Sequence, residues 1–261
     1  MKNSNIFYRN LEEALDVRRK DHSLLSVKQN LCRSGQSIDF SSNDFLSFGS
    51  SGRLRAEFDQ ELARHADLGD GSGGSRVSDG NYEYLEMVED EIARFHKAES
   101  SILIGSGFEA NSSLFAAIPR PGDAIVYDEL SHASTCEGLE KCVATYRVSF
   151  RHNDVDALYE ALMSVRDSQP LIKQGKRTVL IAVESVYSMD GDFCPLAEMV
   201  EVAKDVFPHQ NAHFIVDEAH GTGLMGPNGE GMVCALGLEN EIAIRVHTFG
   251  KAFATTGGKK N

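Results

Sequence analysis

Long hydrophobic runs are missing from the sequence. None of its apolar stretches approaches the roughly 20 residues that cross a bilayer. The N-terminus, MKNSNIFYRNLEEALDVRRK, contains acidic side chains and has no continuous apolar core, unlike secretory and organelle-import signals. We therefore expect a cytoplasmic protein without a membrane span.

Cysteine and basic residues are also scarce. The 5 cysteines are widely spaced and form no C-x-x-C pair, so nothing indicates a disulfide framework or a zinc site, and we expect no metal. The 26 basic residues are outnumbered by 39 acidic ones, which gives a net charge of −13. A surface of this sign repels phosphate backbones, so we expect no nucleic-acid partner.

Nucleotide-binding motifs are incomplete. Two stretches match G-x-G-x-x-G, namely Gly69, Gly71 and Gly74, and Gly221, Gly223 and Gly226. The first does not follow a strand-like run, and Pro227 prevents a helix directly after the second. The tetrapeptide DEAH resembles a helicase motif, but the phosphate loop G-x-x-x-x-G-K-[ST] is absent. A dinucleotide-binding dehydrogenase is therefore the weakest of the alternatives.

The remaining pattern divides the chain into an N-terminal segment, 1–40, and one large domain, 41–261. The first contains a helix-like stretch, NLEEALDVRRKDHSLL, followed by a short extended piece, SIDFSS. In the second, helical stretches such as DALYEALMSV and LAEMVEVAKDVF alternate with short apolar runs. The predicted strands are SILIG, AIVYD, TVLIAVE, HFIVDE and IAIRVH. This alternation predicts an α/β fold with a mostly parallel sheet and flanking helices.

Polar and reactive residues follow every predicted strand. The segments are SGFEAN, DELSHAS, ESVYSMDGD, DEAHGTG and TFGKA. Because ligands bind at the carboxyl edge of open α/β sheets, these distant segments are expected to converge on one site. Ordinary solvated loops are the alternative.

Four groups in these segments together describe a pyridoxal phosphate site. Lys251 offers an amine suited to a Schiff base, since burial depresses the pKa of a lysine. Asp217 needs a cationic or N–H partner, such as a protonated ring nitrogen. His132 offers an imidazole for stacking or proton transfer, and GSGFEAN offers free N–H groups for a phosphate. Taken singly, each has an ordinary explanation: a surface lysine, a loop-capping aspartate, a satisfied histidine and a tight turn.

The chain resembles the α-oxoamine synthases, which are fold-type I pyridoxal phosphate enzymes. The matching segments are FSSNDFLSF, GSGGSRVSDG, SGFEAN, DELSHAS, FRHNDVDAL, SMDGDFCPL, VDEAHGTGLMGPNGEG and TFGKA. They follow the family's order over about residues 38–258. The resemblance implies the large domain of that fold, with pyridoxal 5'-phosphate as the cofactor.

The resemblance also implies four catalytic residues. Lys251 would carry the cofactor as a Schiff base and would remove the substrate's α-proton. Asp217 would pair with the pyridine nitrogen, and His220 would contact the phenolic oxygen. His132 would stack on the ring and touch the substrate.

Five further residues complete the implied site. Gly107 and Phe108 would help to seat the cofactor, and Ser188 and Thr248 would add hydrogen bonds to it. Asn43 would lie near the carboxylate of the substrate.

The implied reaction condenses a small amino acid with an acyl-CoA thioester, with loss of carbon dioxide, to give an α-aminoketone. The resemblance also implies a homodimer or pairing with a related subunit. In members of the biotin pathway an N-terminal arginine engages the acyl substrate's carboxylate, whereas RRKDHSLLSVK has Leu25 there. This difference favours a more apolar acyl chain.

The family's small C-terminal domain has no counterpart in this sequence, and that domain includes an arginine for the substrate carboxylate. We therefore expect a C-terminally truncated family member. A truncated, non-catalytic homologue that binds the cofactor weakly or pairs with a full-length subunit is the alternative function.

Overall fold

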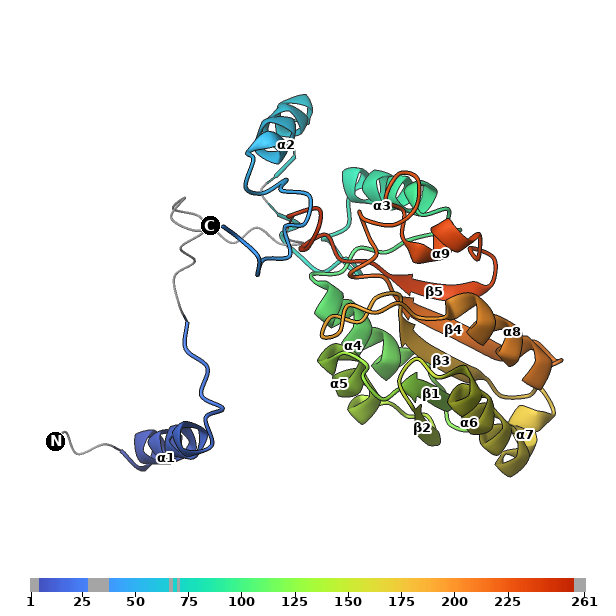
Figure 1. Ribbon diagram of the computed structural model, residues 1–261. Helices are drawn as coiled ribbons and strands as arrows, with labels where there is room; N and C mark the ends of the chain where they lie inside the picture. Colours follow the sequence, from blue (N-terminus) through green and yellow to red (C-terminus); the bar gives the residue numbers. More distant parts are fainter. Residues whose placement is uncertain (1–4, 28–37, 66–67, 70, 256–261) are drawn as a thin grey trace. The chain divides into compact units, whose positions relative to one another are not determined.

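The computed structural model describes residues 5–27, 38–65, 68–69 and 71–255 (Figure 1). The helices are α1 (Ile6–Lys20), α2 (Arg53–Arg64), α3 (Glu83–Phe95), α4 (Gly107–Ala117), α5 (Ala133–Lys141), α6 (Val155–Ser168), α7 (Pro170–Lys173), α8 (Leu196–Val206) and α9 (Met232–Leu236). The strands are β1 (Ala124–Asp128), β2 (Tyr146–Phe150), β3 (Val179–Glu184), β4 (Ala212–Asp217) and β5 (Ile242–Val246). None of the helices in the described ranges combines the length and apolar character that crossing a membrane requires.

The chain forms two compact units, Met1–Ser42 and Asn43–Asn261. The first unit contains α1, which begins after the cap Asn5 and has no buried residue. Its Ile6, Phe7 and Tyr8 side chains are exposed. The predicted helix is therefore present but begins four residues earlier than the stretch NLEEALDVRRKDHSLL, and Ile38–Ser42 forms no strand. Ser37, the first residue of SIDFSS, lies outside the described residues.

A five-stranded sheet organises the second unit. Its order is β2-β1-β3-β4-β5, and all neighbouring strands are parallel. Every residue of β3 is buried, as expected for a central strand covered on both faces. The register pairs Glu184 of β3 with Asp217 of β4, so two carboxylates end adjacent strands. The predicted α/β fold with a mostly parallel sheet is confirmed.

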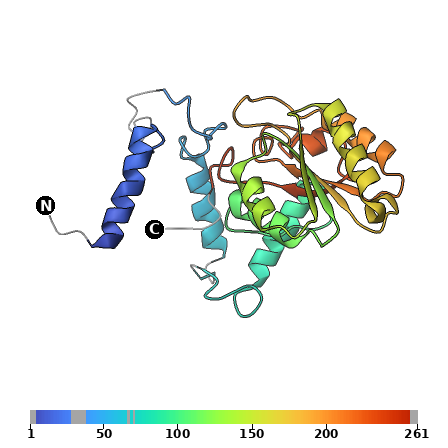
Figure 2. The same ribbon diagram turned by 90° about the horizontal axis from the view of Figure 1, so that it is seen from below.

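The two faces of the sheet bury separate apolar cores. On one face, Ile181 packs with residues of α6 and α8 such as Leu158 and Met199. On the other, Leu180 packs with Phe115 of α4 and residues of α5. Successive strand side chains point to opposite faces, so alternate residues of β3 enter the two cores. Figures 1 and 2 show the resulting layers, with α4 and α5 on one side of the strands and α6 and α8 on the other.

The strand order positions a site at one edge of the sheet. The chain passes from β1 outward to β2 and then returns across β1 to β3, so the direction of strand addition reverses between β1 and β3. Loops diverge at such a switch point, which leaves room for a ligand at the carboxyl ends. His132 follows β1 and Glu184 ends β3, so both lie at this point.

One predicted strand is wrong and one strand was missed. Ser101–Gly105 is irregular chain, and its Leu103 N–H donates to the Glu89 carboxylate at 2.5 Å instead of to a strand. Conversely, Tyr146–Phe150 forms the edge strand β2, whose residues are largely exposed except Phe150. A short apolar run does not make a strand without a pairing partner, and an edge strand needs no apolar run.

Candidate active site at the carboxyl ends of the strands

Lys251 and His220 form the centre of the site. Lys251 lies in a turn after β5, and its Nζ is 2.8 Å from Nε2 of His220 in the loop after β4. Burial lowers the pKa of Lys251, although the carboxylates of Asp217 and Glu184 oppose this shift. Burial and the nearby Lys251 also lower the pKa of His220. A neutral imidazole can therefore accept a hydrogen bond from the lysine nitrogen.

Asp217 is buried at the end of β4 and already has two partners. Its Oδ2 accepts from Nδ2 of Asn111 at 2.6 Å, and its Oδ1 accepts from the Ala219 N–H at 2.8 Å. Asn111 is itself buried on α4. A carboxylate offers about four acceptor positions, so Asp217 retains capacity for a further donor. The two contacts satisfy the buried charge and hold the carboxylate in one orientation.

His132 caps α5 and is fixed through its backbone. Its N–H donates to Oε1 of Glu184 at 2.6 Å, which ties the loop after β1 to the end of β3. Its Nδ1 lies 2.7 Å from the Ser134 hydroxyl, and its ring meets Phe108 edge-on with centroids 6.0 Å apart. The Asn111 amide also donates to the Ser134 hydroxyl at 3.2 Å. His132 and Asp217 are therefore connected through a chain of hydrogen bonds that passes through Ser134 and then Asn111.

The N-terminus of α4 approaches the segment that carries Lys251. Ser106 caps this helix by accepting from the Glu109 N–H at 3.1 Å. A Cβ added to Gly107 would lie 3.0 Å from the Cβ of Thr248, so only glycine fits without a shift. Free N–H groups in this first helical turn attract anions. The GSGFEAN turn and Thr248 are thus brought together.

Glu184 is the most perturbed carboxyl group of the site. Burial and the neighbouring Asp217 charge raise its pKa to about 7, although the His132 N–H and Lys251 oppose the shift. A narrow crevice over the ends of β3 and β4 is lined by Glu184 and Asp217, together with Asn111. The site therefore contains one carboxyl group that is partly protonated at neutral pH.

Two predicted residues are not drawn into these contacts. Ser188 lies in an exposed turn after β3, and Asn43 lies in an exposed bend. Neither side chain makes a hydrogen bond to another described residue. Sequence reasoning had overlooked Asn111 and Glu184. Both stand in segments recognised as strand-end motifs, so their position was a signal that went unused.

The glutamate of DEAH has a structural explanation. Glu218 is fully buried and accepts from the N–H groups of Met232 at 3.0 Å and Val233 at 2.8 Å, where α9 begins. Gly223 and Gly226 have φ angles of 83° and 84° in the intervening loop. These contacts shape a turn that returns the chain to β5. They do not form the strand–turn–helix unit of a dinucleotide site.

The chain is similar to known proteins over most of its length. A model of the family Aminotransferase class I and II matches residues 36–259. The chain is 57% identical over 257 residues to the Aminoacyl transferase sphA of Aspergillus fumigatus, covering 98% of this chain and 55% of that protein. It is 48% identical over 248 residues to an 8-amino-7-oxononanoate synthase of Emericella nidulans, covering 95% and 60%. A solved Sphingomonas wittichii serine palmitoyltransferase has a TM-score of 0.71 and 33% identity over 83% of this chain and 50% of that one.

The chain therefore spans little more than half the length of the curated relatives it matches. Similar solved structures include serine palmitoyltransferase with pyridoxal phosphate. The family match, the identities and the shared fold agree with one another. The chain belongs to the aminotransferase class I and II family and, within it, to the α-oxoamine synthases, a family that uses pyridoxal phosphate.

Proposed function

We propose that this protein is a pyridoxal phosphate-dependent acyltransferase of the α-oxoamine synthase type. It would condense a small amino acid with an acyl-CoA thioester, with decarboxylation, to an α-aminoketone. The observation that carries the proposal is the meeting of Lys251 and His220 at 2.8 Å, within the electrostatic reach of Asp217. An amine with a lowered pKa beside a buried carboxylate suits a covalent bond to an aldehyde cofactor.

The residues present fit pyridoxal phosphate at three points. The lysine amine has a lowered pKa, and the buried Asp217 has acceptor capacity left for a protonated ring nitrogen. A Cβ at Gly107 would lie 3.0 Å from the Cβ of Thr248, so glycine allows the start of α4 to approach Thr248, and the first N–H groups of a helix have no intrahelical partner. These three features correspond to the aldehyde, the pyridine nitrogen and the phosphate of the cofactor.

Each side chain then has a defined role. The bound cofactor would supply an electron sink that stabilises a carbanion at the amino acid's α-carbon. Nζ of Lys251, once free, would take the α-proton, and Nε2 of His220 would hold that nitrogen in place. The Asp217 carboxylate would keep a proton on the ring nitrogen. His132 would cover the ring face and exclude water, and Thr248 would add a hydrogen bond.

The substrates and assembly remain part of the proposal. Asn43 would lie near the amino acid's carboxylate, and Phe108 and Ser188 would complete the cofactor contacts. Leu25 replaces the arginine expected for a carboxylated acyl donor, which supports an apolar acyl chain. In a homodimer, or in a pair with a related subunit, the second chain would contribute residues to the substrate site. The alternative is a non-catalytic homologue that binds the cofactor weakly or pairs with a full-length subunit.

Spectroscopy tests the cofactor assignment. Titrating pyridoxal phosphate into the purified protein should produce the visible-edge absorbance of a lysine-linked cofactor, and borohydride reduction should fix it on the peptide containing Lys251. Lys251→Ala should abolish the band, while Lys176→Ala, which changes an exposed lysine, should leave it intact. An unchanged band in Lys251→Ala would show that the lysine assignment is wrong.

An activity assay separates the two functions. Thiol release is measured with glycine, serine or alanine and with acyl-CoAs of increasing chain length, alone and with a full-length relative. Release by the chain alone supports the acyltransferase, with apolar donors expected to be faster than dicarboxylic ones. A normal absorbance band without any thiol release would favour the non-catalytic homologue.

A further inference from the structure

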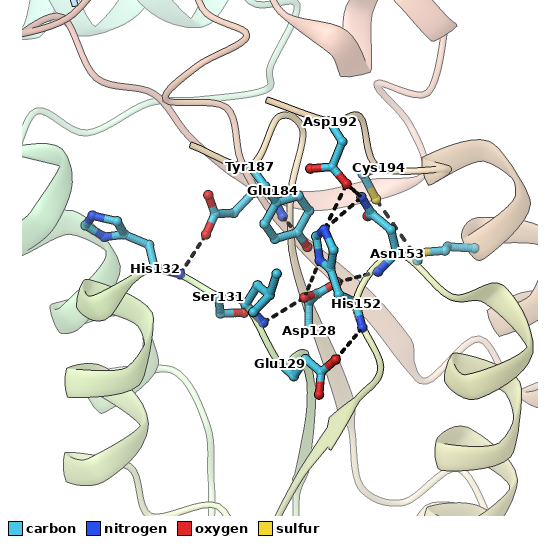
Figure 3. A network of polar contacts seen from close by, with 12 residues as sticks. Asp128, Glu129, Ser131, His132, His152, Asn153, Glu184, Tyr187, Asp192 and Cys194 are labelled. Atoms are coloured by element: carbon cyan, nitrogen blue, oxygen red, sulfur yellow. Dashed lines mark hydrogen bonds and ion pairs between the residues drawn. The ribbon is translucent and has the colours of Figure 1, made fainter. Parts of the chain in front are cut away.

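His152 bridges two carboxylates beside the proposed cofactor site. Its Nδ1 lies 2.8 Å from Oδ1 of Asp128, and its Nε2 lies 2.9 Å from Oδ2 of Asp192 (Figure 3). Asp128 ends β1, His152 follows β2 and Asp192 follows β3. One imidazole therefore ties together the loops after three strands. Because an ionised carboxylate only accepts hydrogen bonds, a protonated imidazole can donate from Nδ1 to Asp128 and from Nε2 to Asp192.

The same imidazole contacts a buried tyrosine that leads toward Glu184. The rings of His152 and Tyr187 meet edge-on at 86°, with centroids 4.5 Å apart. The Tyr187 hydroxyl accepts from the Glu184 N–H at 3.2 Å. Tyr187 is 2% exposed, so its ring has no freedom to move away. His152 therefore restrains the backbone at the end of β3.

Two routes lead from His152 to His132. Through β3, the Glu184 carboxylate accepts the His132 N–H at 2.6 Å. Through β1, Asp128 accepts the Leu130 N–H at 2.9 Å, which fixes the loop that leads into His132. Figure 3 shows the contacts of His152 with Asp128 and Asp192, and the contact between Glu184 and the His132 N–H.

We propose that His152 is a positioning residue that orders the loop carrying His132 by clamping Asp128 and Asp192. The inference rests on the proposed function only in taking His132 as a cofactor-contacting residue. His152 itself would touch neither the cofactor nor the substrate. It acts through Asp128 and Glu184, whose contacts fix where the His132 imidazole lies.

The acid–base chemistry of His152 agrees with this role. Burial would lower its pKa, but hydrogen bonds to Asp128 and Asp192 outweigh burial and raise it. The same interactions lower the pKa of Asp192 against the effect of its partial burial. The raised pKa of His152 favours its protonated form, which donates stronger hydrogen bonds to a carboxylate than a neutral imidazole does.

Hydrogen exchange tests the inference without any cofactor. The protection factor of the His132 amide is measured by NMR in the wild type, in His152→Gln, which can keep one bond, and in His152→Leu, which keeps none. We expect protection to fall about five-fold in His152→Leu and less in His152→Gln, the loss of roughly one net hydrogen bond. His213→Gln is the matched control, since His213 is an exposed histidine on β4.

A pH series of the same measurement distinguishes a titrating clamp from a purely structural role of His152, which would not depend on pH. In the wild type, the protection factor of the His132 amide should decline as pH rises through the His152 pKa, and this decline should be absent in both His152 variants. If His152→Leu does not fold, Asp192→Asn replaces it. This substitution removes the charge of one partner of His152, and the Asp192 side chain is 41% exposed, so the change disturbs packing less. Equal protection at His132 in wild type and variants, or an equal loss in all strands, would overturn the inference.

Cofactor titration of the same proteins separates this inference from the proposed function. If the wild type gives no absorbance band but the His152 variants lose protection at the His132 amide, the proposed function is contradicted and the clamp is supported. A normal band with unchanged protection contradicts the clamp alone. If both hold, the variants should bind pyridoxal phosphate several-fold more weakly than wild type, with the order wild type, His152→Gln, His152→Leu.

Discussion

The carboxyl edge of the sheet has two halves with opposite acid–base character. After β1, β2 and β3, His152 lies between Asp128 and Asp192, and these carboxylates raise its pKa in spite of burial. After β5, burial dominates and lowers the pKa of both Lys251 and His247. The first half favours a protonated imidazole, and the second favours neutral nitrogen bases.

The difference between the halves comes from partners and not from burial alone. His247 stacks on His96 with ring centroids 3.6 Å apart, and its Nδ1 pairs with the Thr222 hydroxyl at 2.8 Å. Nδ1 of His96 donates to the backbone carbonyl oxygen of Glu230 at 2.8 Å. Neither imidazole is hydrogen-bonded to a carboxylate among the described residues, so desolvation dominates, and Glu230 opposes it only in part at His96. The chemistry of a histidine here is set by the loop that faces it.

Removing Asp217 should have the largest effect on cofactor affinity, because it removes the buried carboxylate next to Lys251 and His220. Asp217→Ala removes the carboxylate that accepts from the Asn111 amide and, on the proposed function, the counter-charge of the cofactor ring. We expect pyridoxal phosphate affinity to fall about 100-fold, as for a lost charge-assisted hydrogen bond. Fluorescence titration measures this, with Asp205→Ala as an exposed control on α8. Affinity equal to wild type would contradict the role of Asp217.

Acid should weaken the half that contains His96 and His247. The pKa of both is lowered on folding by burial, so the unfolded chain binds their protons first as pH falls below about 6.5. Stability is therefore present above that pH and is lost as pH decreases, by at most about 1.4 kcal/mol per pH unit for each histidine.

Urea unfolding between pH 7 and pH 5 measures this slope. His247→Phe should reduce it by removing one group that titrates, whereas His213→Gln, an exposed change on β4, should not. A slope that is the same in His247→Phe and wild type would show that this pair does not govern acid stability.

Alkaline pH should weaken the other half by a smaller amount. The folded pKa of His152 is raised, so its contribution is complete below about pH 6.5 and is lost as pH rises through the folded value. The groups that face or adjoin it are Asp128 from β1, Glu129 after β1, Asp192, Tyr187 and Cys194 after β3, and Arg151, Asn153 and Asp154 beside it. The free energies of unfolding of wild type and His152→Gln are measured from pH 6 to pH 9, and the difference between them should be smaller at pH 9 than at pH 6. A constant difference would contradict a titrating clamp.

The smallest expected effect concerns the electrostatic link between Glu184 at the end of β3 and Lys251 after β5. Glu184 raises the pKa of Lys251, so Glu184→Gln should lower that pKa and shift the pH midpoint for cofactor attachment downward. Because the pKa of Glu184 is about 7, the difference from wild type should fade below that pH. Glu198→Gln, on the exposed side of α8, is the control. A midpoint that moves upward would contradict the electrostatic link.

Pattern reasoning predicted the general fold well because buried parallel strands leave a clear signal. AIVYD, TVLIAVE, HFIVDE and IAIRVH all contain strands of the sheet. Ser101–Gly105 was predicted as a strand on the same apolar signal and is irregular, since pairing depends on a partner. Tyr146–Phe150 was not predicted as a strand, because an edge strand with exposed residues has no apolar run.

The candidate site was predictable only in part, for a related reason. Asp217 ends β4 and Lys251 lies in the segment that follows β5, so chain order and sheet topology suffice to bring them to one edge. The partners of Asp217 and His132, Asn111 and Glu184, depend on how helix α4 and the strand ends face one another. No spacing rule supplies that information.

The sequence by itself determined the α/β alternation, the residues at the strand ends and the family resemblance, because each is carried by local order along the chain. The tertiary structure decided which of those residues meet. Residues separated by 106 positions, Asn111 and Asp217, share a hydrogen bond, and His152 lies between Asp128 and Asp192, 24 and 40 positions away. The physical reason is that a pKa depends on the distance to charges and on desolvation, and both are fixed only when the loops are packed.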